Sequence, residues 1–196
     1  MHRIVPLLIG ALVLSGCSWL FRERIPDFPT ARQQYEYATA LFEVTEPLPP
    51  ERDRGPWNNQ ENNPYNDALT PRYRERDYRN FIHAFEKVPE RFPTDTDFRP
   101  LAMIRLGEFH HLLGEYTPAV TYYRSVISEF PDDNFLQATG LFGLGRVKMG
   151  QSQYGEANRI FMRLLQDHGT SEVPQIVELC ERARQNVLQL RNQLTS

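Results

Sequence analysis

Residues 106–131 read LGEFHHLLGEYTPAVTYYRSVISEFP, and this stretch decides how the chain folds. It places Gly114 between two segments in which apolar residues recur every three or four positions. Pro118 lies early in the second segment, and Pro131 directly follows it. Glycine after a helix, and proline in the first turn or beyond the last turn, mark helix ends and starts. The stretch therefore predicts two helices, 100–113 and 117–130, joined by a tight turn.

The same pattern recurs at a spacing of 38 residues. Residues 144–169, LGRVKMGQSQYGEANRIFMRLLQDHG, align with 106–131 without a gap and predict helices at 136–149 and 154–166. A third copy aligns further upstream. The corresponding positions are Tyr78, Tyr116 and Tyr154; Phe81, Ala119 and Ala157; Phe85, Tyr123 and Phe161; and Val88, Val126 and Leu164. One helical hairpin cannot bury its apolar face alone, whereas stacked hairpins can.

The first hairpin is predicted to be split. Its helices are expected at 30–44 and 73–92, and between them residues 45–71 hold six prolines and five asparagines, a composition typical of a loop. After the third hairpin, residues 173–194 carry one apolar and one polar face, as a capping helix would. The predicted fold is all-α: a short α-α solenoid of three hairpins plus a C-terminal capping helix, spanning residues 30–194.

Four positions in each unit resemble the tetratricopeptide repeat. A small residue is followed by alanine twelve positions later, an aromatic residue four after that, and proline eight further on. In the second hairpin these are Gly107, Ala119, Tyr123 and Pro131, and in the third they are Gly145, Ala157, Phe161 and Gly169, where glycine replaces the proline. The resemblance implies three tetratricopeptide-like hairpins.

The first residues resemble the start of a bacterial lipoprotein. A basic start is followed by an apolar run from 4 to 14, which is too short to span a membrane, and then by the string LSGC at 14–17. This string is similar to the lipobox, which implies a signal peptide at 1–16, lipid on Cys17 and a tether at 17–29. An aspartate directly after the cysteine would resemble the inner-membrane retention signal. Ser18 at that position therefore favours the outer membrane, with the domain facing the periplasm. The alternatives are an ordinary signal peptide with a chance cysteine, or a signal anchor.

Composition and motifs exclude several function classes. The net charge is −3 and the chain has no long basic run, so nucleic acid is not an expected partner. No phosphate loop, GxSxG or HExxH occurs, so we expect no enzyme and no cofactor beyond the lipid on Cys17. Glu108, His111 and Glu115 have spacings that could face a metal, but a solvated or groove-lining face is the favoured interpretation. Cys180 is expected to be a small core residue.

The repeat junctions ERFPTD at 90–95 and SEFPDD at 128–133 are similar to those of the BamD-like lipoproteins of the outer-membrane β-barrel assembly machinery. The resemblance covers residues 28–170 and implies a membrane-anchored scaffold that binds envelope proteins, most directly in outer-membrane protein assembly. A pilotin-like lipoprotein that handles a secretin is the first alternative. A regulator of a cell-wall enzyme is the second.

The resemblance also implies where a partner binds. The groove positions of the first helix in each hairpin are Tyr35, Thr39 and Phe42; Ile104, Glu108 and His111; and Phe142, Arg146 and Met149. The alternative for Ile104, Phe142 and Met149 is that they pack between repeats. Trp57, in the loop insert, is a further candidate, because aromatic residues on loops often anchor interfaces.

Overall fold

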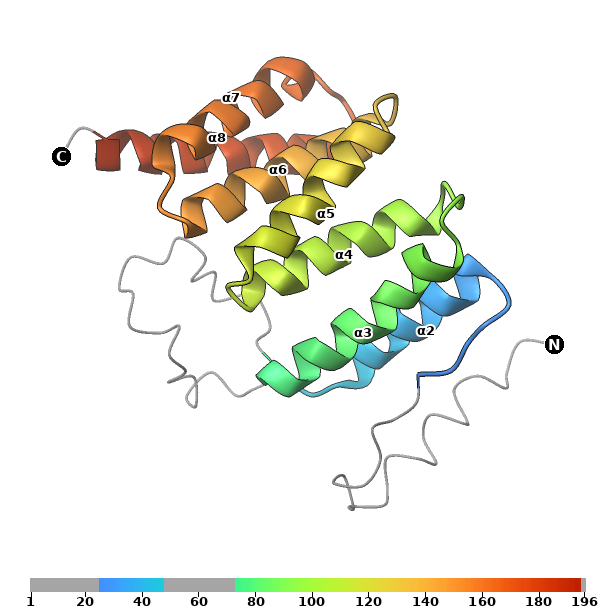
Figure 1. Ribbon diagram of the computed structural model, residues 1–196. Coiled ribbons are helices and arrows are strands. Elements are labelled where there is room, and N and C mark those ends of the chain that lie inside the picture. Colours follow the sequence, from blue (N-terminus) through green and yellow to red (C-terminus); the bar gives the residue numbers. More distant parts are fainter. Residues whose placement is uncertain (1–24, 48–72, 195–196) are drawn as a thin grey trace.

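The computed structural model describes residues 25–47 and 73–194. These residues form seven helices and no strand, in agreement with the predicted all-α class (Figure 1). The helices are α2 (Ala31–Val44), α3 (Glu75–Arg91), α4 (Phe98–Leu112), α5 (Tyr116–Glu129), α6 (Asn134–Gly150), α7 (Tyr154–His168) and α8 (Pro174–Leu194). The predicted signal peptide at 1–16, Cys17, Trp57 and most of the 45–71 insert lie outside the described residues.

Each helix packs against the next one along the chain, so the predicted hairpins are α2–α3, α4–α5 and α6–α7, followed by α8. The prediction of three hairpins and a capping helix is confirmed. Figure 1 shows the three hairpins and α8 stacked one on another from the N-terminal to the C-terminal end of the domain.

Aspartate side chains set the starts of two helices. The Asp95 carboxylate accepts hydrogen bonds from the N–H groups of Phe98 (2.6 Å) and Arg99 (3.2 Å). Helix α4 therefore begins two residues before the predicted start at 100. Asp133 is the N-cap of α6 and accepts from the N–H of Leu136 at 2.9 Å. Such bonds satisfy N–H groups that have no partner within the helix.

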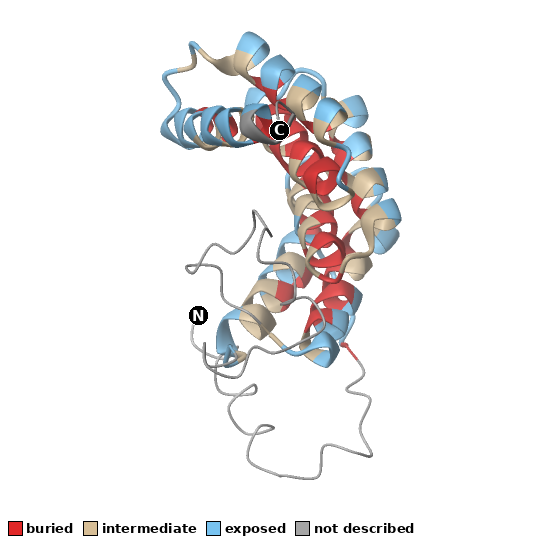
Figure 2. Cartoon of the chain, turned by 90° about the vertical axis from the view of Figure 1, so that its left-hand side faces the viewer, coloured by how far each residue is buried: buried red, intermediate tan, exposed pale blue. Residues whose placement is uncertain are grey.

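The helices form two rows that are spaced differently. The inner row is α2, α4, α6 and α8, and each of these helices contacts the next member of the row. The outer row is α3, α5 and α7, and over the described residues no Cα atom of one of these helices lies within 8 Å of a Cα atom of another. Closer spacing in one row bends a stack towards that row. Figure 2 shows the resulting curvature, with a continuous band of buried residues running through the stack.

Small residues allow the two helices of a hairpin to approach closely. A Cβ atom on Gly107 would lie 2.9 Å from the Tyr123 ring, and one on Gly145 would lie 2.6 Å from the Phe161 ring. Ala119 and Ala157, the repeat alanines, are fully buried in the same hairpins. The repeat pattern thus reflects how these two hairpins pack. In each, an aromatic residue of the outer helix occupies the space left by a glycine of the inner helix.

The first hairpin is packed by aromatic side chains instead. Phe81, at the position of the repeat alanine, is buried and lies 5.3 Å from Phe42 and 5.5 Å from Phe109, measured between ring centroids. Burying one such ring stabilises the fold by about 1.5–3 kcal/mol. Residues 25–29, predicted as the end of the tether, also join this hairpin. The buried Gln34 side chain accepts from the Phe28 N–H at 3.1 Å, and Lys87 pairs with Asp27 at 2.6 Å.

Candidate interaction surface

Tyr123 of α5 helps to shape the inner row between α4 and α6. Its ring fills the space beside Gly107, and a Cβ atom on Gly143 would lie only 2.3 Å from it. Burial raises the pKa of the Tyr123 hydroxyl, and the charge of Glu108 raises it further, while Arg146 and Arg105 oppose the shift. The hydroxyl is therefore neutral at physiological pH. It lies close enough to Glu108, Arg146 and Arg105 to interact with their charges.

The α2 residues predicted to bind a partner are engaged in packing. Tyr35 is partly buried and lies 5.5 Å from Phe85 between ring centroids. Phe42 is also partly buried and makes an edge-on contact with Phe81. Thr39 differs, because its buried hydroxyl has no hydrogen-bond partner among the described residues. These side chains mainly hold the first hairpin together.

Glu108 is the charged residue that α4 contributes to the predicted binding set, and it is partly exposed. Its carboxylate pairs with Arg105 at 3.0 Å, and about a third of its side chain is exposed. Burial alone would lower the pKa of Arg105, but Glu108 and Tyr35 outweigh that effect and raise it. Ile104 is partly buried against the cluster that contains Met103 and Val126.

His111 was expected on a solvated or groove-lining face, but it is buried, with 8% of its surface exposed. Burial, followed by the charge of Arg146, lowers its pKa to about 3. The imidazole is therefore neutral at physiological pH. Its ring lies 6.0 Å from that of Tyr116. Inaccessibility argues against direct contact between His111 and a partner.

On α6 the structure separates the predicted residues into two kinds. Phe142 and Met149 are 5% and 3% exposed and belong to the core cluster shared by α6, α7 and α8. They therefore pack between repeats, which was the alternative interpretation. Arg146 is partly exposed, and its guanidinium lies 6.0 Å from the centroid of the Phe142 ring. Of the three, Arg146 offers the most surface to a partner.

Sequence reasoning missed Arg182 of α8. Its guanidinium lies 4.9 Å from the centroid of the same Phe142 ring, and the side chain is partly exposed. The polar face of α8 was interpreted only as the solvated face of a cap. One sequence feature could have indicated a role for α8 in the inner row. The 38-residue spacing aligns α8 with the inner-row helices, and Ala183 is then equivalent to Gly145. The accessible charged set is thus Arg105, Glu108, Arg146 and Arg182.

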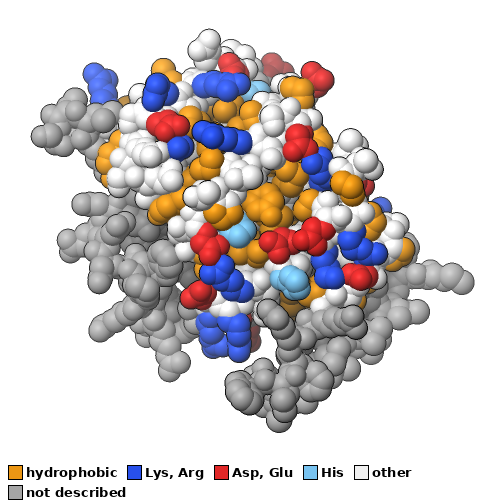
Figure 3. All heavy atoms as spheres, in the orientation of Figure 1, with side chains coloured by type: hydrophobic (Ala, Val, Ile, Leu, Met, Phe, Trp, Pro, Cys, Tyr) orange, Lys and Arg blue, Asp and Glu red, His pale blue; other side chains and the backbone are white. Residues whose placement is uncertain are grey.

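A separate polar chain runs from α3 to the turn between α4 and α5 and the last turn of α4. Glu115 bonds to the Nδ1 atom of His110 at 2.7 Å and pairs with Arg79 of α3 at 2.6 Å, which links the first two hairpins. Because Glu115 is held by these partners, it does not join Glu108 and His111 in the metal-ligand set that their spacing allowed. Over residues 25–47 and 73–194, no three histidine, cysteine or acidic side chains are grouped as metal ligands. Figure 3 shows charged and apolar side chains intermixed on the face drawn there.

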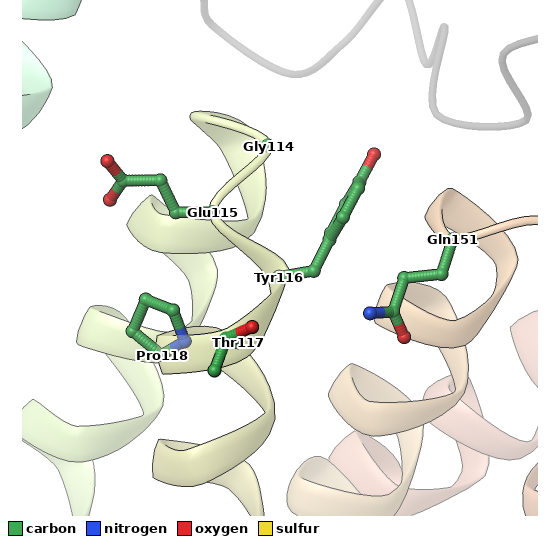
Figure 4. A pocket seen from close by; sticks show the side chains of 6 residues that line it. All are labelled: Gly114, Glu115, Tyr116, Thr117, Pro118 and Gln151. Atoms are coloured by element: carbon green, nitrogen blue, oxygen red, sulfur yellow. The ribbon is translucent and has the colours of Figure 1, made fainter.

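A surface hollow of about 530 Å³ lies where the α4–α5 turn meets the end of α6 (Figure 4). Gly114, with a φ of 74°, makes the turn. Tyr116 stands between the turn and Gln151, whereas Glu115 points away. The hollow is open, and burial raises the pKa of the Tyr116 hydroxyl. It lies at the turns between helices and is separate from the charged residues of the inner row.

Cys180, expected as a small core residue, is buried between α7 and α8, with its thiol 3.6 Å from the His168 carbonyl oxygen. Burial raises the pKa of this thiol. In the described part of the chain, no helix combines the length and the apolar character needed to cross a bilayer.

The family model for the tetratricopeptide repeat matches residues 101–133, the segment that forms α4 and α5. No curated protein matches the chain. The second hairpin is therefore a tetratricopeptide repeat, and the flanking hairpins continue its register and packing. Tetratricopeptide repeats typically serve as non-enzymatic modules that bind other proteins.

Proposed function

We propose that this tetratricopeptide-repeat chain is a lipid-anchored scaffold that holds a protein partner on the inner row of its helices in the bacterial envelope. One observation carries the proposal: the inner row forms a continuous curved surface on which Glu108 and Arg146 stay accessible while the apolar residues beside them are packed. Solenoids use such concave surfaces to bind extended partners.

The anchor rests on the sequence LSGC at 14–17, with lipid on Cys17 as part of the proposal. Residues 25–29 pack on the first hairpin through the Asp27–Lys87 ion pair and the Gln34 hydrogen bonds. A lipid upstream of them would therefore hold the domain by its N-terminal end. Three acyl chains, as in lipoproteins of this kind, would give a firm attachment.

Outer-membrane protein assembly is the process favoured for this scaffold. The junctions at 90–95 and 128–133, similar to those of the BamD-like lipoproteins, support it. Ser18 after the lipidated cysteine favours the outer membrane. A pilotin-like role would use the same surface to hold a secretin, and regulation of a cell-wall enzyme would use it to hold that enzyme.

Capture of partners from detergent-solubilised envelopes tests the proposal. We expect the full chain to retain β-barrel assembly components, and a variant with Glu108→Arg and Arg146→Glu to lose them. The double change should lower the free energy of unfolding by no more than about 1 kcal/mol, because exposed ion pairs contribute little. Recovery of a secretin or a cell-wall enzyme instead would select one of the alternatives.

Two further variants separate the anchor from the binding surface. Cys17→Ala should be released in soluble form or retained as uncleaved precursor, and mass spectrometry of the mature wild-type protein should show acylated Cys17. An unmodified Cys17 would refute the anchor. If the inner-row variant captures its partner normally, deletion of residues 49–66 would test the insert and Trp57 as the binding element.

A further inference from the structure

Helix α8 closes the C-terminal end of the stack, and over the described residues it packs only against α6 and α7 (Figure 1). Its buried residues, among them Ile176, Cys180 and Ala183, belong to the core cluster shared with those two helices. Two large apolar side chains elsewhere on the helix stay exposed, Val177 by 39% and Leu188 by 63%. Single exposed apolar residues are common on protein surfaces, so their arrangement decides whether this side of α8 is a contact surface.

The exposed residues of α8 fall into two stripes. Val177, Glu181, Arg184 and Leu188 are all exposed and follow one another at intervals of four, three and four residues. These intervals keep side chains on one side of a helix and are those of the contact seam of a coiled coil. We call these four residues the exposed seam of α8. The neighbouring stripe is wholly polar and consists of Gln175, Glu178, Gln185 and Gln189.

The exposed seam is complementary to itself when its direction is reversed. If a second copy of the seam is laid against it antiparallel, Val177 lies opposite Leu188 of the second copy, and Glu181 lies opposite Arg184. Every contact then occurs twice, as a two-fold symmetric interface requires. A parallel arrangement would instead place Glu181 opposite Glu181 and Arg184 opposite Arg184, where like charges repel. The order of the residues therefore favours one direction of pairing.

We infer that the exposed seam of α8 binds the same seam of a second copy of this chain, antiparallel, and that the protein forms a two-fold dimer through it. Within one copy, Glu181 and Arg184 pair with each other at 2.5 Å, and both side chains are exposed. Exchanging these pairs for pairs between the two copies changes the free energy little, because exposed ion pairs contribute little. The charges thus set direction and register, while burial of Val177 and Leu188 supplies the stability.

A second copy fits the exposed seam better than a membrane does. An anionic bilayer surface attracts Arg184 but repels Glu181, whereas a second copy pairs with both. Helix α8 has 21 residues and is therefore about 30 Å long. One pair of such helices gives a small interface, so we expect a dimer that forms at micromolar concentrations rather than a permanent one.

Sedimentation equilibrium of the full chain, in detergent whose density the solvent matches, tests the inference. We expect the wild-type chain to form dimers as its concentration rises. Glu181→Arg and Arg184→Glu should each weaken dimerisation about tenfold or more, because like charges then face each other. An equimolar mixture of these two variants should dimerise again, since their altered seams are complementary. Leu188→Gln should weaken dimerisation through the loss of apolar burial.

The matched control is Glu178→Arg, the same charge reversal on the polar stripe of the same helix. It should leave dimerisation unchanged, and the variants should keep the wild-type thermal midpoint. If a single variant fails to fold, the double variant with Glu181→Arg and Arg184→Glu still tests the inference, because it restores the complementary seam and should dimerise like the wild type.

A wild-type chain that stays monomeric would overturn the inference, as would a folded mixture or double variant that stays monomeric. Equal loss in Glu178→Arg would also overturn it. So would a monomer that binds phosphatidylglycerol vesicles through Leu188. The inference goes beyond the proposed function and does not depend on it, because self-association is measured with the purified chain alone.

Discussion

At the scale of single residues, Gly143 and Gly155 occupy opposite environments. A Cβ atom on Gly143 would meet the Tyr123 ring at 2.3 Å, whereas one on Gly155 would meet nothing within 4 Å. The Tyr123 ring cannot move aside easily, because Gly107 borders it on α4. Both glycines are helical, so alanine would gain up to about 1 kcal/mol of helix propensity at either position.

Gly143→Ala is therefore expected to lower the free energy of unfolding by about 1–2 kcal/mol, since overpacking outweighs the gain in propensity. Gly155→Ala, its control, should raise it by about 0.5–1 kcal/mol. Urea denaturation followed by circular dichroism measures both. A stabilised Gly143→Ala would show that the ring does not separate α4 from α6 as described.

Thr39 has a buried hydroxyl with no partner among the described residues, and such a group costs about 1–3 kcal/mol. Thr39→Val has nearly the same shape and removes the hydroxyl, so we expect the free energy of unfolding to rise by about 1 kcal/mol. If that hydroxyl serves a partner, the same variant should also weaken capture. A destabilised Thr39→Val would mean that the hydroxyl is bonded within the fold.

His111 makes stability depend on pH. Its pKa is about 3 in the folded state and about 6.5 in the unfolded chain. Below pH 6.5 the unfolded chain takes up a proton that the folded state excludes, so stability falls as the pH falls. Between pH 7 and pH 5 the loss from this residue is about 2 kcal/mol. His111→Gln should lose correspondingly less over that interval, and an identical loss in both proteins would contradict the buried neutral imidazole.

At the scale of helices, the 38-residue spacing predicted the hairpins correctly. The turn residues that end each helix and the small residues that allow two helices to pack closely recur at that same spacing. Gly107 and Gly145, the small residues of the repeat pattern, are both points of close approach between the helices of a hairpin. The register could not show that Gly143 also contacts Tyr123, since that contact joins different repeats. Helix starts were less predictable: the start of α4 depends on the Asp95 side chain rather than on Pro100.

The binding residues were harder to predict than the helices. Carrying groove positions over from a family assumes that equal positions have equal exposure, but neighbouring helices bury Phe142, Met149 and His111. Arg182 was missed because its contact with Phe142 crosses from α8 to α6, and no spacing within one helix reveals such a pair.

The packing of α6 against α7 can be tested at Ala157, which is fully buried. Ala157→Trp should destabilise by overpacking, on the order of 1–3 kcal/mol. Met162→Trp is the control on the same helix, where half of the side chain is exposed, and it should change stability by no more than about 0.5 kcal/mol. Equal effects would mean that the two faces of α7 are misassigned.

At the scale of the whole molecule, the unequal spacing of the two rows gives the domain its curvature and one concave side. The first hairpin is packed by aromatic rings and also holds residues 25–29, where an upstream lipid would connect. The last hairpin and α8 carry the arginines over Phe142. The proposed anchor thus lies at the N-terminal end of the stack, and the inner-row residues Glu108 and Arg146 lie further along it.

Site-specific photo-crosslinking in intact cells tests the central claim most directly. A photoreactive phenylalanine analogue would replace Glu108 or Arg146 on the inner row, and Arg124 or Met162 on the outer row. The account predicts that both inner-row positions crosslink to the same envelope protein while the outer-row positions do not. Crosslinks to a partner from the outer-row positions alone would contradict it.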